Sequence, residues 1–316
     1  MIYDLIIVGG GPAGVAAGVY AGRKKIKTFL IAEEFGGQSL VSDGIENWIG
    51  IKKISGFELA KMLEEHVRAY GEEVEIKMPE KVVSVKKIDL GWEVATDKGG
   101  VYQSKTLIVA SGGKRRRLAI PGEDKFDGKG VSYCSTCDAP IFKDKTVAVI
   151  GGGNAGLEAT IDLFPYASKI YLMNRKSELV GDPSTQEDVR KSPKVTIINN
   201  AQVQEILGDQ FVSALKYLDK QDNQIKELAV EGIFVEIGSI PNSEFMKGLV
   251  EMNSGGEIIV DHKTGKTSHD GIFAAGDITD EIYKQNNISA GDGVAAALSA
   301  YNYLLNIKKQ SPAYEK

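Results

Sequence analysis

Two cysteines set two residues apart, Cys134 and Cys137, are the only thiols of this 316-residue chain, and Asp138 follows them directly. Two thiolates at this spacing often form half of a tetrahedral zinc site. The chain has no further cysteine, and its three histidines stand apart from any second pair (His66, His262 and His269). The pattern therefore favours a redox-active dithiol, with zinc or an inert disulfide as the alternatives, and a redox dithiol needs a source of electrons.

A glycine-rich turn near the N-terminus has the spacing of a dinucleotide-binding loop. An apolar run over residues 3–8 leads into Gly9, Gly11 and Gly14, and small residues follow. Glycines at these positions allow a tight turn, a close approach to a pyrophosphate and close packing of a helix on a strand. Glu33 ends the next apolar run and can accept hydrogen bonds from both ribose hydroxyls. Its alternative role is that of a solvated loop acid.

A second turn repeats the pattern with Gly151, Gly153 and Gly156. Arg175 follows Gly151 at the same spacing, 24 residues, as Glu33 follows Gly9. An acid suits the free ribose hydroxyls of FAD or NAD, whereas an arginine can clamp a 2′-phosphate with forked, charge-assisted bonds. The two turns therefore predict FAD at the first and a nicotinamide dinucleotide at the second, unless Arg175 and Lys176 are a surface pair that binds nothing.

A third element lies far along the chain from the first turn. The apolar run over residues 271–275 ends in Gly276 and Asp277, and a run rich in alanine and glycine begins at Ser289. The carboxylate can bind a ribityl chain or a pyrophosphate group, or it can cap the helix that follows. The run from Ser289 predicts a closely packed helix whose N-terminus faces an electron-rich ring.

Length and charge limit the class of protein. A chain of this length predicts two domains, and its net charge of −5 argues against a nucleic-acid or anionic-membrane surface. The basic run over residues 114–117 is interpreted as a solvated linker face. The first residues have neither the pattern of a signal peptide nor the length of a membrane span. We therefore expect a cytoplasmic protein, where a structural disulfide is unusual.

The order of these motifs resembles the low-molecular-weight thioredoxin reductases over essentially the whole chain. It is also similar to the C-terminal part of the flavoprotein subunit of alkyl hydroperoxide reductase. Between the two glycine turns lie three further family motifs, which are GGQ (residues 36–38), ENW (residues 46–48) and CxxCD (residues 134–138). The resemblance implies an α/β protein with two Rossmann-like three-layer domains, the second inserted into the first. The FAD domain would comprise residues 1–114 and 244–316, and the NAD(P)H domain with the CxxC motif residues 115–243.

The resemblance also implies roles for single residues. Cys134 would exchange with the disulfide of a thioredoxin-like protein, Cys137 would lie by the flavin, and Asp138 would move a proton provided that burial raises its pKa. Asp138 could instead be an N-cap or turn residue, Asn47 a turn residue, and Gln38 and Gln285 surface amides. The cofactor-binding residues expected from turns and resemblance together are Gly9, Gly11, Pro12, Ala13, Gly14, Glu33, Gly37, Gln38, Asn47, Val83, Gly112, Gly151, Gly153, Asn154, Ala155, Gly156, Arg175, Lys176, Gly276, Asp277, Gln285 and Asn286.

The chain departs from the family pattern at the nicotinamide turn. Members that use NADPH read HRR and then a further arginine where this chain has Asn174, Arg175, Lys176 and later Val180, and many have alanine in place of Gly156. We expect a modest preference for NADPH, with NADH or a ferredoxin-type donor as alternatives. No N-terminal thioredoxin-like extension is present in the sequence, so we do not expect a peroxidase reductase of the full-length kind.

The activity expected from the resemblance is that of a thioredoxin-disulfide reductase, a homodimer whose domains rotate during turnover. Electrons would pass from NAD(P)H through FAD to the Cys134–Cys137 disulfide and on to a thioredoxin-like protein. The alternatives are a reductase of another carrier, such as a glutaredoxin-like or peroxidase-linked protein, and a non-catalytic flavin-bound redox sensor. No metal, nucleic acid or membrane is expected to take part.

Overall fold

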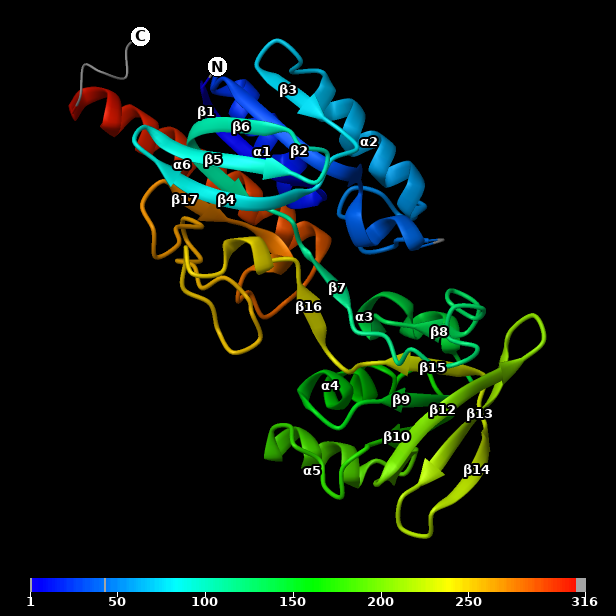
Figure 1. Cartoon of the computed structure of the whole chain (residues 1–316). Coiled ribbons are helices and arrows are strands. Elements are labelled where there is room, and N and C mark those ends of the chain that lie inside the picture. The colour runs from blue at the N-terminus through cyan, green and yellow to red at the C-terminus, as the bar shows by residue number, and fades with distance from the viewer. Residues whose placement is uncertain (1, 43, 311–316) are drawn as a thin grey trace. The chain divides into compact units, whose positions relative to one another are not determined.

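Two α/β units, each built around its own central sheet, make up the chain (Figure 1). The computed structural model describes residues 2–42 and 44–310. Unit 1 is formed by two segments, Met1–Lys114 and Ile240–Lys316, and unit 2 by one, Arg115–Ser239. The short strands β7 (Gly113–Arg115) and β16 (Ser239–Pro241) pair with each other where the chain passes between the units.

The sheet of unit 1 combines parallel central strands with an antiparallel edge. Its strand order is β3-β2-β1-β6-β5-β4, and the late strand β17 pairs with β6 in parallel. The apolar run predicted before the first glycine turn becomes β1, and the run ending at Glu33 and Glu34 lies in β2. The strands are β1 (Ile2–Gly10), β2 (Thr28–Phe35), β3 (Val74–Lys77), β4 (Val82–Ile88), β5 (Gly91–Thr96), β6 (Val101–Val109) and β17 (Ile272–Ala274).

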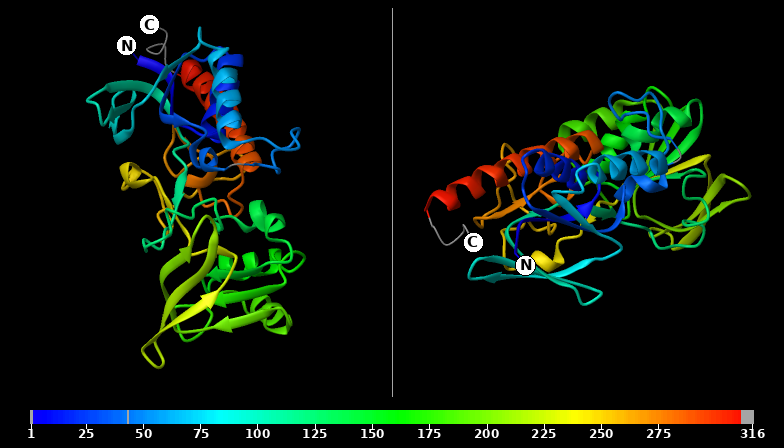
Figure 2. Two further views of the ribbon diagram at one scale, coloured as in Figure 1. Left: turned by 90° about the vertical axis from the view of Figure 1, so that its right-hand side faces the viewer. Right: turned by 90° about the horizontal axis from the view of Figure 1, so that it is seen from above.

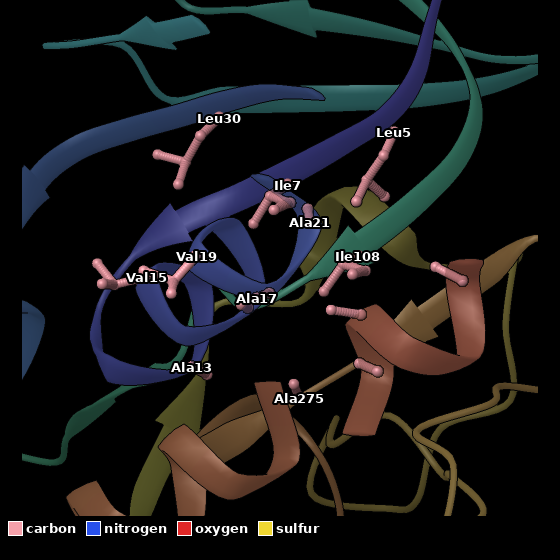
Figure 3. Packing of buried hydrophobic residues seen from close by; sticks show 14 of the residues in the cluster. Leu5, Ile7, Ala13, Val15, Ala17, Val19, Ala21, Leu30, Ile108 and Ala275 are labelled. Atoms are coloured by element: carbon pink, nitrogen blue, oxygen red, sulfur yellow. The ribbon is translucent and has the colours of Figure 1, made fainter. Parts of the chain in front are cut away.

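The helices of unit 1 cover one face of this sheet. Small side chains let α1 (Pro12–Arg23) pack closely against the strands and against α6 (Asn286–Gln310), which runs alongside it (Figure 2). Figure 3 shows Leu5, Ile7 and Ile108 directed from β1 and β6 toward α1. The expected helix from Ser289 is present, but it begins three residues earlier, at Asn286.

The remaining helical segments of unit 1 are short or peripheral. Helix α2 (Gly56–Arg68) starts with a capping box, in which Ser55 Oγ accepts from the N–H of Glu58 at 3.2 Å and Glu58 Oε2 accepts from the N–H of Ser55 at 3.2 Å.

A second apolar core lies between the sheet and the irregular chain after residue 240. The 3₁₀ turns are η1 (Gly37–Val41), η3 (Glu244–Met246) and η4 (Gly276–Ile278).

Unit 2 has three layers around a parallel sheet of order β11-β10-β9-β15-β8. Helices α4 (Asn154–Asp162) and α5 (Pro183–Lys191) cover one face, and an antiparallel meander covers the other. The sheet contains β8 (Val131–Ser132), β9 (Thr146–Ile150), β10 (Lys169–Met173), β11 (Val195–Ile198) and β15 (Gly232–Val235). The meander contains β12 (Ala201–Gly208), β13 (Val212–Asp219) and β14 (Gln224–Ala229). The predicted class, α/β with two Rossmann-like three-layer units, is confirmed.

Candidate functional site

The first glycine turn joins the end of β1 to the start of α1. Gly9 has a φ of 117°, which disfavours a side chain, and a Cβ on Gly14 would overlap the carbonyl oxygen of Gly9. Gly11 is the N-cap of α1, and no atom lies within 4 Å of the position that its Cβ would take. Pro12 and Ala13 open the helix, and the first N–H groups of a helix have no acceptor within it. The turn is therefore an open cradle with backbone donors, as a pyrophosphate requires.

Asp277 brings the C-terminal segment to this turn. Its Oδ2 accepts from Gln38 Nε2 at 3.2 Å, and its Oδ1 accepts from Ser289 Oγ at 3.1 Å. Gly276, with a φ of 76°, lies so close to α1 that a Cβ on it would be 3.0 Å from Cβ of Ala13. Asp277 is thus held between η1 and α6 by bonds from side chains of both elements.

A network of amides links the loop after η1 to the start of α6. Asn47 Nδ2 donates to Gln285 Oε1 at 3.1 Å, and Asn287 Nδ2 donates to the carbonyl oxygen of Asn47 at 2.7 Å. Ser39 Oγ lies 3.0 Å from Asn286 Oδ1. The structure therefore brings together the four nominated amide residues of unit 1, which lie on two segments far apart in the chain: Gln38, Asn47, Gln285 and Asn286.

The other nominated residues of unit 1 are spread over β2, η1, β4 and the segment before β7. Glu33 is exposed at the end of β2, where its Oε1 lies 3.4 Å from Lys81 Nζ. Val83, exposed on β4, follows that lysine by two residues. Gly37 and Gly112 both have positive φ, 55° and 62°. Glu33 is thus a strand-end acid beside the start of β4, and not an isolated loop residue.

The second glycine turn has the same construction as the first. Gly151 has a φ of 145°, and a Cβ on Gly156 would overlap its carbonyl oxygen. Gly153 is the N-cap of α4, and its Cβ position is likewise free of atoms within 4 Å. Asn154 and Ala155 begin the helix and are exposed. The sheet end of unit 2 therefore presents a second cradle.

The strand-end loop after β10 is organised by Asn174, whose importance the sequence did not reveal. This buried side chain donates to the carbonyl oxygen of Glu178 at 2.7 Å and to Asn199 Oδ1 at 3.1 Å, and its Oδ1 accepts from the N–H of Lys176 at 3.2 Å. Arg175 and Lys176 are exposed. Asn174 therefore fixes the backbone from which these two basic side chains extend.

Cys134 and Cys137 form a disulfide across one helical turn. Cys134 follows β8 and is the N-cap of α3 (Ser135–Asp138), and its Sγ accepts from the N–H of Cys137 at 3.2 Å. Cys134 is partly buried and Cys137 is exposed. A thiolate at the Cys134 position would accept the same N–H bond, which stabilises negative charge on sulfur.

Asp138 lies at the other end of this turn and is largely withdrawn from water. Burial raises the pKa of its carboxyl, while a hydrogen bond from Ser132 Oγ at 2.6 Å opposes the shift. Ser132 Oγ also accepts from the N–H of Cys134 at 3.2 Å. The condition set for Asp138 as a proton carrier, a raised pKa, therefore holds, and its side chain does not cap the 3₁₀ turn that follows, Ala139–Phe142.

Glu236 is a further acid near the dithiol that sequence reasoning missed. It directly follows β15, and its carboxylate accepts from the N–H of Ser135. Burial raises its pKa to about 7, against the opposing influence of the Arg115 guanidinium. Ser135 Oγ in turn donates to Asp162 Oδ2 at 2.8 Å. The available signal was an acid immediately after a buried parallel strand, the edge where sites of open α/β sheets lie.

Within residues 2–42 and 44–310, no group of three or more histidine, cysteine, aspartate or glutamate side chains is arranged to hold a metal ion. None of the helices in those ranges is both long enough and apolar enough to cross a membrane.

Comparison with known proteins identifies the family. The family model described as pyridine nucleotide-disulphide oxidoreductase matches residues 3–293. The chain is 45% identical over 303 residues to an NADH dehydrogenase of Bacillus subtilis (strain 168), covering 96% of this chain and 59% of that protein. It is 45% identical over 305 residues to an alkyl hydroperoxide reductase subunit of Pseudomonas aeruginosa, covering 96% of this chain and 58% of that protein.

The chain thus spans less than two thirds of the length of these two curated relatives. Among solved structures, thioredoxin reductase from Giardia duodenalis matches with a TM-score of 0.90 and 31% identity, covering 96% of this chain and 99% of that one. The resemblance that the motifs carried is confirmed. The chain belongs to the pyridine nucleotide-disulphide oxidoreductase family.

Proposed function

We propose that this chain is a flavin-dependent disulfide reductase that uses a reduced nicotinamide to reduce a small thioredoxin-like protein through its Cys134–Cys137 pair. Family membership implies FAD and a pyridine nucleotide as cofactors. The observation that carries the proposal is a CxxC disulfide followed directly by Asp138, whose pKa is raised by burial, in a chain with two open glycine cradles.

The residues of unit 1 fit FAD. A side chain at Gly11 would occupy the cradle, Glu33 lies near the end of β2 where a ribose would lie, and Asp277 is held beside the turn. Bound there, FAD would supply a two-electron relay between a nicotinamide and the disulfide. Gly153 and the exposed Arg175 would hold the nicotinamide dinucleotide in unit 2.

The chain's own residues account for the thiol chemistry. Reduction of the disulfide takes two electrons and two protons and yields two thiols. Asp138, whose pKa is raised, can hold one of these protons close to the sulfurs. The Cys134 thiolate then attacks a partner disulfide to form a mixed disulfide, and Cys137 displaces the reduced partner as the intramolecular disulfide re-forms.

A thioredoxin-like partner is supported by the match to a solved thioredoxin reductase, of which 99% of the length is covered. A second candidate is a peroxidase-linked carrier, which the 45% identity to a subunit of alkyl hydroperoxide reductase supports. A flavin-bound redox sensor would share the site but would not turn over. By the same resemblance we propose a homodimer, which sedimentation equilibrium would test.

The experiment that tests the proposal measures bound flavin and turnover together. The purified protein should be yellow, release one FAD per chain on denaturation, and reduce thioredoxin with NADPH or NADH. A colourless protein that cannot be reconstituted with FAD contradicts the proposal. Flavin reduction without turnover of thioredoxin, glutaredoxin or a peroxidase-linked carrier supports the sensor instead.

The two cysteines should have different roles. In Cys134→Ser, the Cys137 thiolate should give a long-wavelength charge-transfer band with oxidised flavin. Cys137→Ser should lack this band and trap a mixed disulfide with the carrier through Cys134. Each variant is the matched control for the other, and exchanged phenotypes would reverse the assignment.

The nicotinamide is tested at Arg175. One good charge-assisted clamp on a 2′-phosphate favours NADPH by about 10- to 100-fold in kcat/KM. Arg175→Ala should remove most of that preference and leave NADH kinetics nearly unchanged. Arg190→Ala, at an exposed arginine of α5, is the control. Faster anaerobic flavin reduction by NADH than by NADPH in the unmodified protein would show that Arg175 clamps no phosphate.

A further inference from the structure

Glu236 lies near the dithiol but has no role in the chemistry proposed above. Its N–H donates to the carbonyl oxygen of Ile150 at 2.9 Å, which fixes the backbone of Glu236 at the carboxyl end of the sheet, beside Gly151. From there the partly buried carboxylate accepts the N–H of Ser135, the residue that follows Cys134. The carboxylate and the Cys134 sulfur therefore both accept N–H groups of the same single turn, α3.

The charged groups around Glu236 come from two elements, β7 and α4. Arg115 of β7 attracts its carboxylate, whereas Asp162 and Glu158 of α4 repel it. Asp162 is itself bound by hydroxyl groups of the CxxC turn, Ser135 Oγ at 2.8 Å and Thr136 Oγ1 at 3.3 Å. The carbonyl oxygen of Ile150, on β9, accepts the N–H of Glu236. The amino end of the dithiol turn therefore faces acids, and Glu236 is the one that contacts its backbone.

We propose that Glu236 is a positioning residue of the dithiol, which holds the first N–H of the CxxC turn and whose negative charge makes the reduced Cys134 harder to ionise. The inference deepens the proposed function and rests on it for the role of the dithiol. Asp138 lies at the opposite end of the turn and is bound by Ser132, so the two acids act on different ends. A pKa of about 7 means that the charge at Glu236 changes within the physiological range.

Charge and geometry can be separated because glutamine keeps the acceptor oxygen and loses the charge. The full chain is reduced with a phosphine, and the rate of alkylation by iodoacetamide is followed from about pH 6 to pH 10, with Cys134 and Cys137 distinguished by peptide mass. In Glu236→Gln the apparent pKa of Cys134 should fall by roughly half a unit to one unit, as expected when a nearby like charge is removed. Alkylation of Cys134 at about pH 7.5 should then be about 3- to 10-fold faster.

Two further variants complete the test. Glu236→Asp keeps the charge and should retain a profile close to that of the unmodified protein. Glu187→Gln removes an exposed carboxylate of α5 in the same unit and should leave the profile unchanged. An unaltered Cys134 profile in Glu236→Gln, or an equal shift in Glu236→Asp, overturns the proposal. Alkylation requires neither nicotinamide nor carrier, so failure of the reductase activity would be seen separately.

Discussion

The stability of this protein should depend on pH through Glu236. Its pKa is raised from 4.5 to about 7 in the folded chain, so between these pH values the folded state binds a proton that the unfolded state has released. Under that condition the free energy of unfolding falls as the pH rises, and the loss is complete above about pH 7. The raised pKa therefore means that the folded state loses stability when this carboxylate is ionised.

Glu236→Gln should remove that cost. The pKa difference of about 2.5 units corresponds to an upper limit of about 3 kcal/mol, and solvent access to the partly buried side chain reduces this to roughly 1–2 kcal/mol. One kcal/mol shifts Tm by about 2–4 °C in a domain of about 150–250 residues. We therefore expect Tm to rise by about 2–8 °C at pH 8 and to change little at pH 5.

Calorimetry of both proteins between about pH 5 and pH 8.5 measures this directly, with Glu187→Gln as the control for loss of one exposed carboxylate. A stabilisation of equal size at pH 5 and pH 8 would mean that packing, and not ionisation, is responsible. No stabilisation at either pH would refute the reasoning.

Three further substitutions probe the cradle, the strand-end loop and a helix cap. Gly156→Ala should lower the free energy of unfolding by about 1–2 kcal/mol in urea titrations. The new Cβ would overlap the carbonyl oxygen of Gly151, and the cost of this overlap outweighs the gain in helix propensity. Unchanged stability would show that α4 can shift to make room for the methyl group. Asn174→Ala should lower the free energy of unfolding by about 1–3 kcal/mol, because it leaves buried groups unpaired, and should reduce the discrimination between NADPH and NADH. If the discrimination is retained, the loop that Asn174 holds does not determine which cofactor is used. Ser55→Ala should cost about 0.5–2 kcal/mol through loss of the capping box of α2, with no effect on Cys134 alkylation; a stability equal to that of the parent would contradict the cap's contribution.

Local sequence predicted the strand–turn–helix units well. In both, glycine spacing is dictated within a few residues by backbone geometry, so β1 with α1 and β9 with α4 could be recognised without tertiary information. The amide network of Asn47 with Gln285 could not, because it joins segments that have no common local pattern. Those residues were nominated only by the resemblance.

The missed residues are ones whose role depends on burial. Asn174 was treated as a lost basic contact, yet it organises the loop through its buried amide. Glu236 is marked in the sequence only by the apolar run that precedes it, and the parallel pairing of β15 with β9 and β8 places it near the dithiol. The basic run over residues 114–117 is mostly exposed, as predicted, but Arg115 is partly buried and acts on Glu236.

The division of unit 1 into two segments has a consequence for synthesis on the ribosome. Strand β17 and helix α6, which pair with β6 and pack on α1, are translated only after all of unit 2 has emerged. Because domains generally fold as units during synthesis, the continuous unit 2 can complete its core while unit 1 still lacks the strand that pairs with the end of β6 and the helix that packs on α1. Released chains truncated near residue 245 should therefore contain a protease-resistant unit 2 and a sensitive first segment; resistance of both would show that residues 1–114 fold without their late partners.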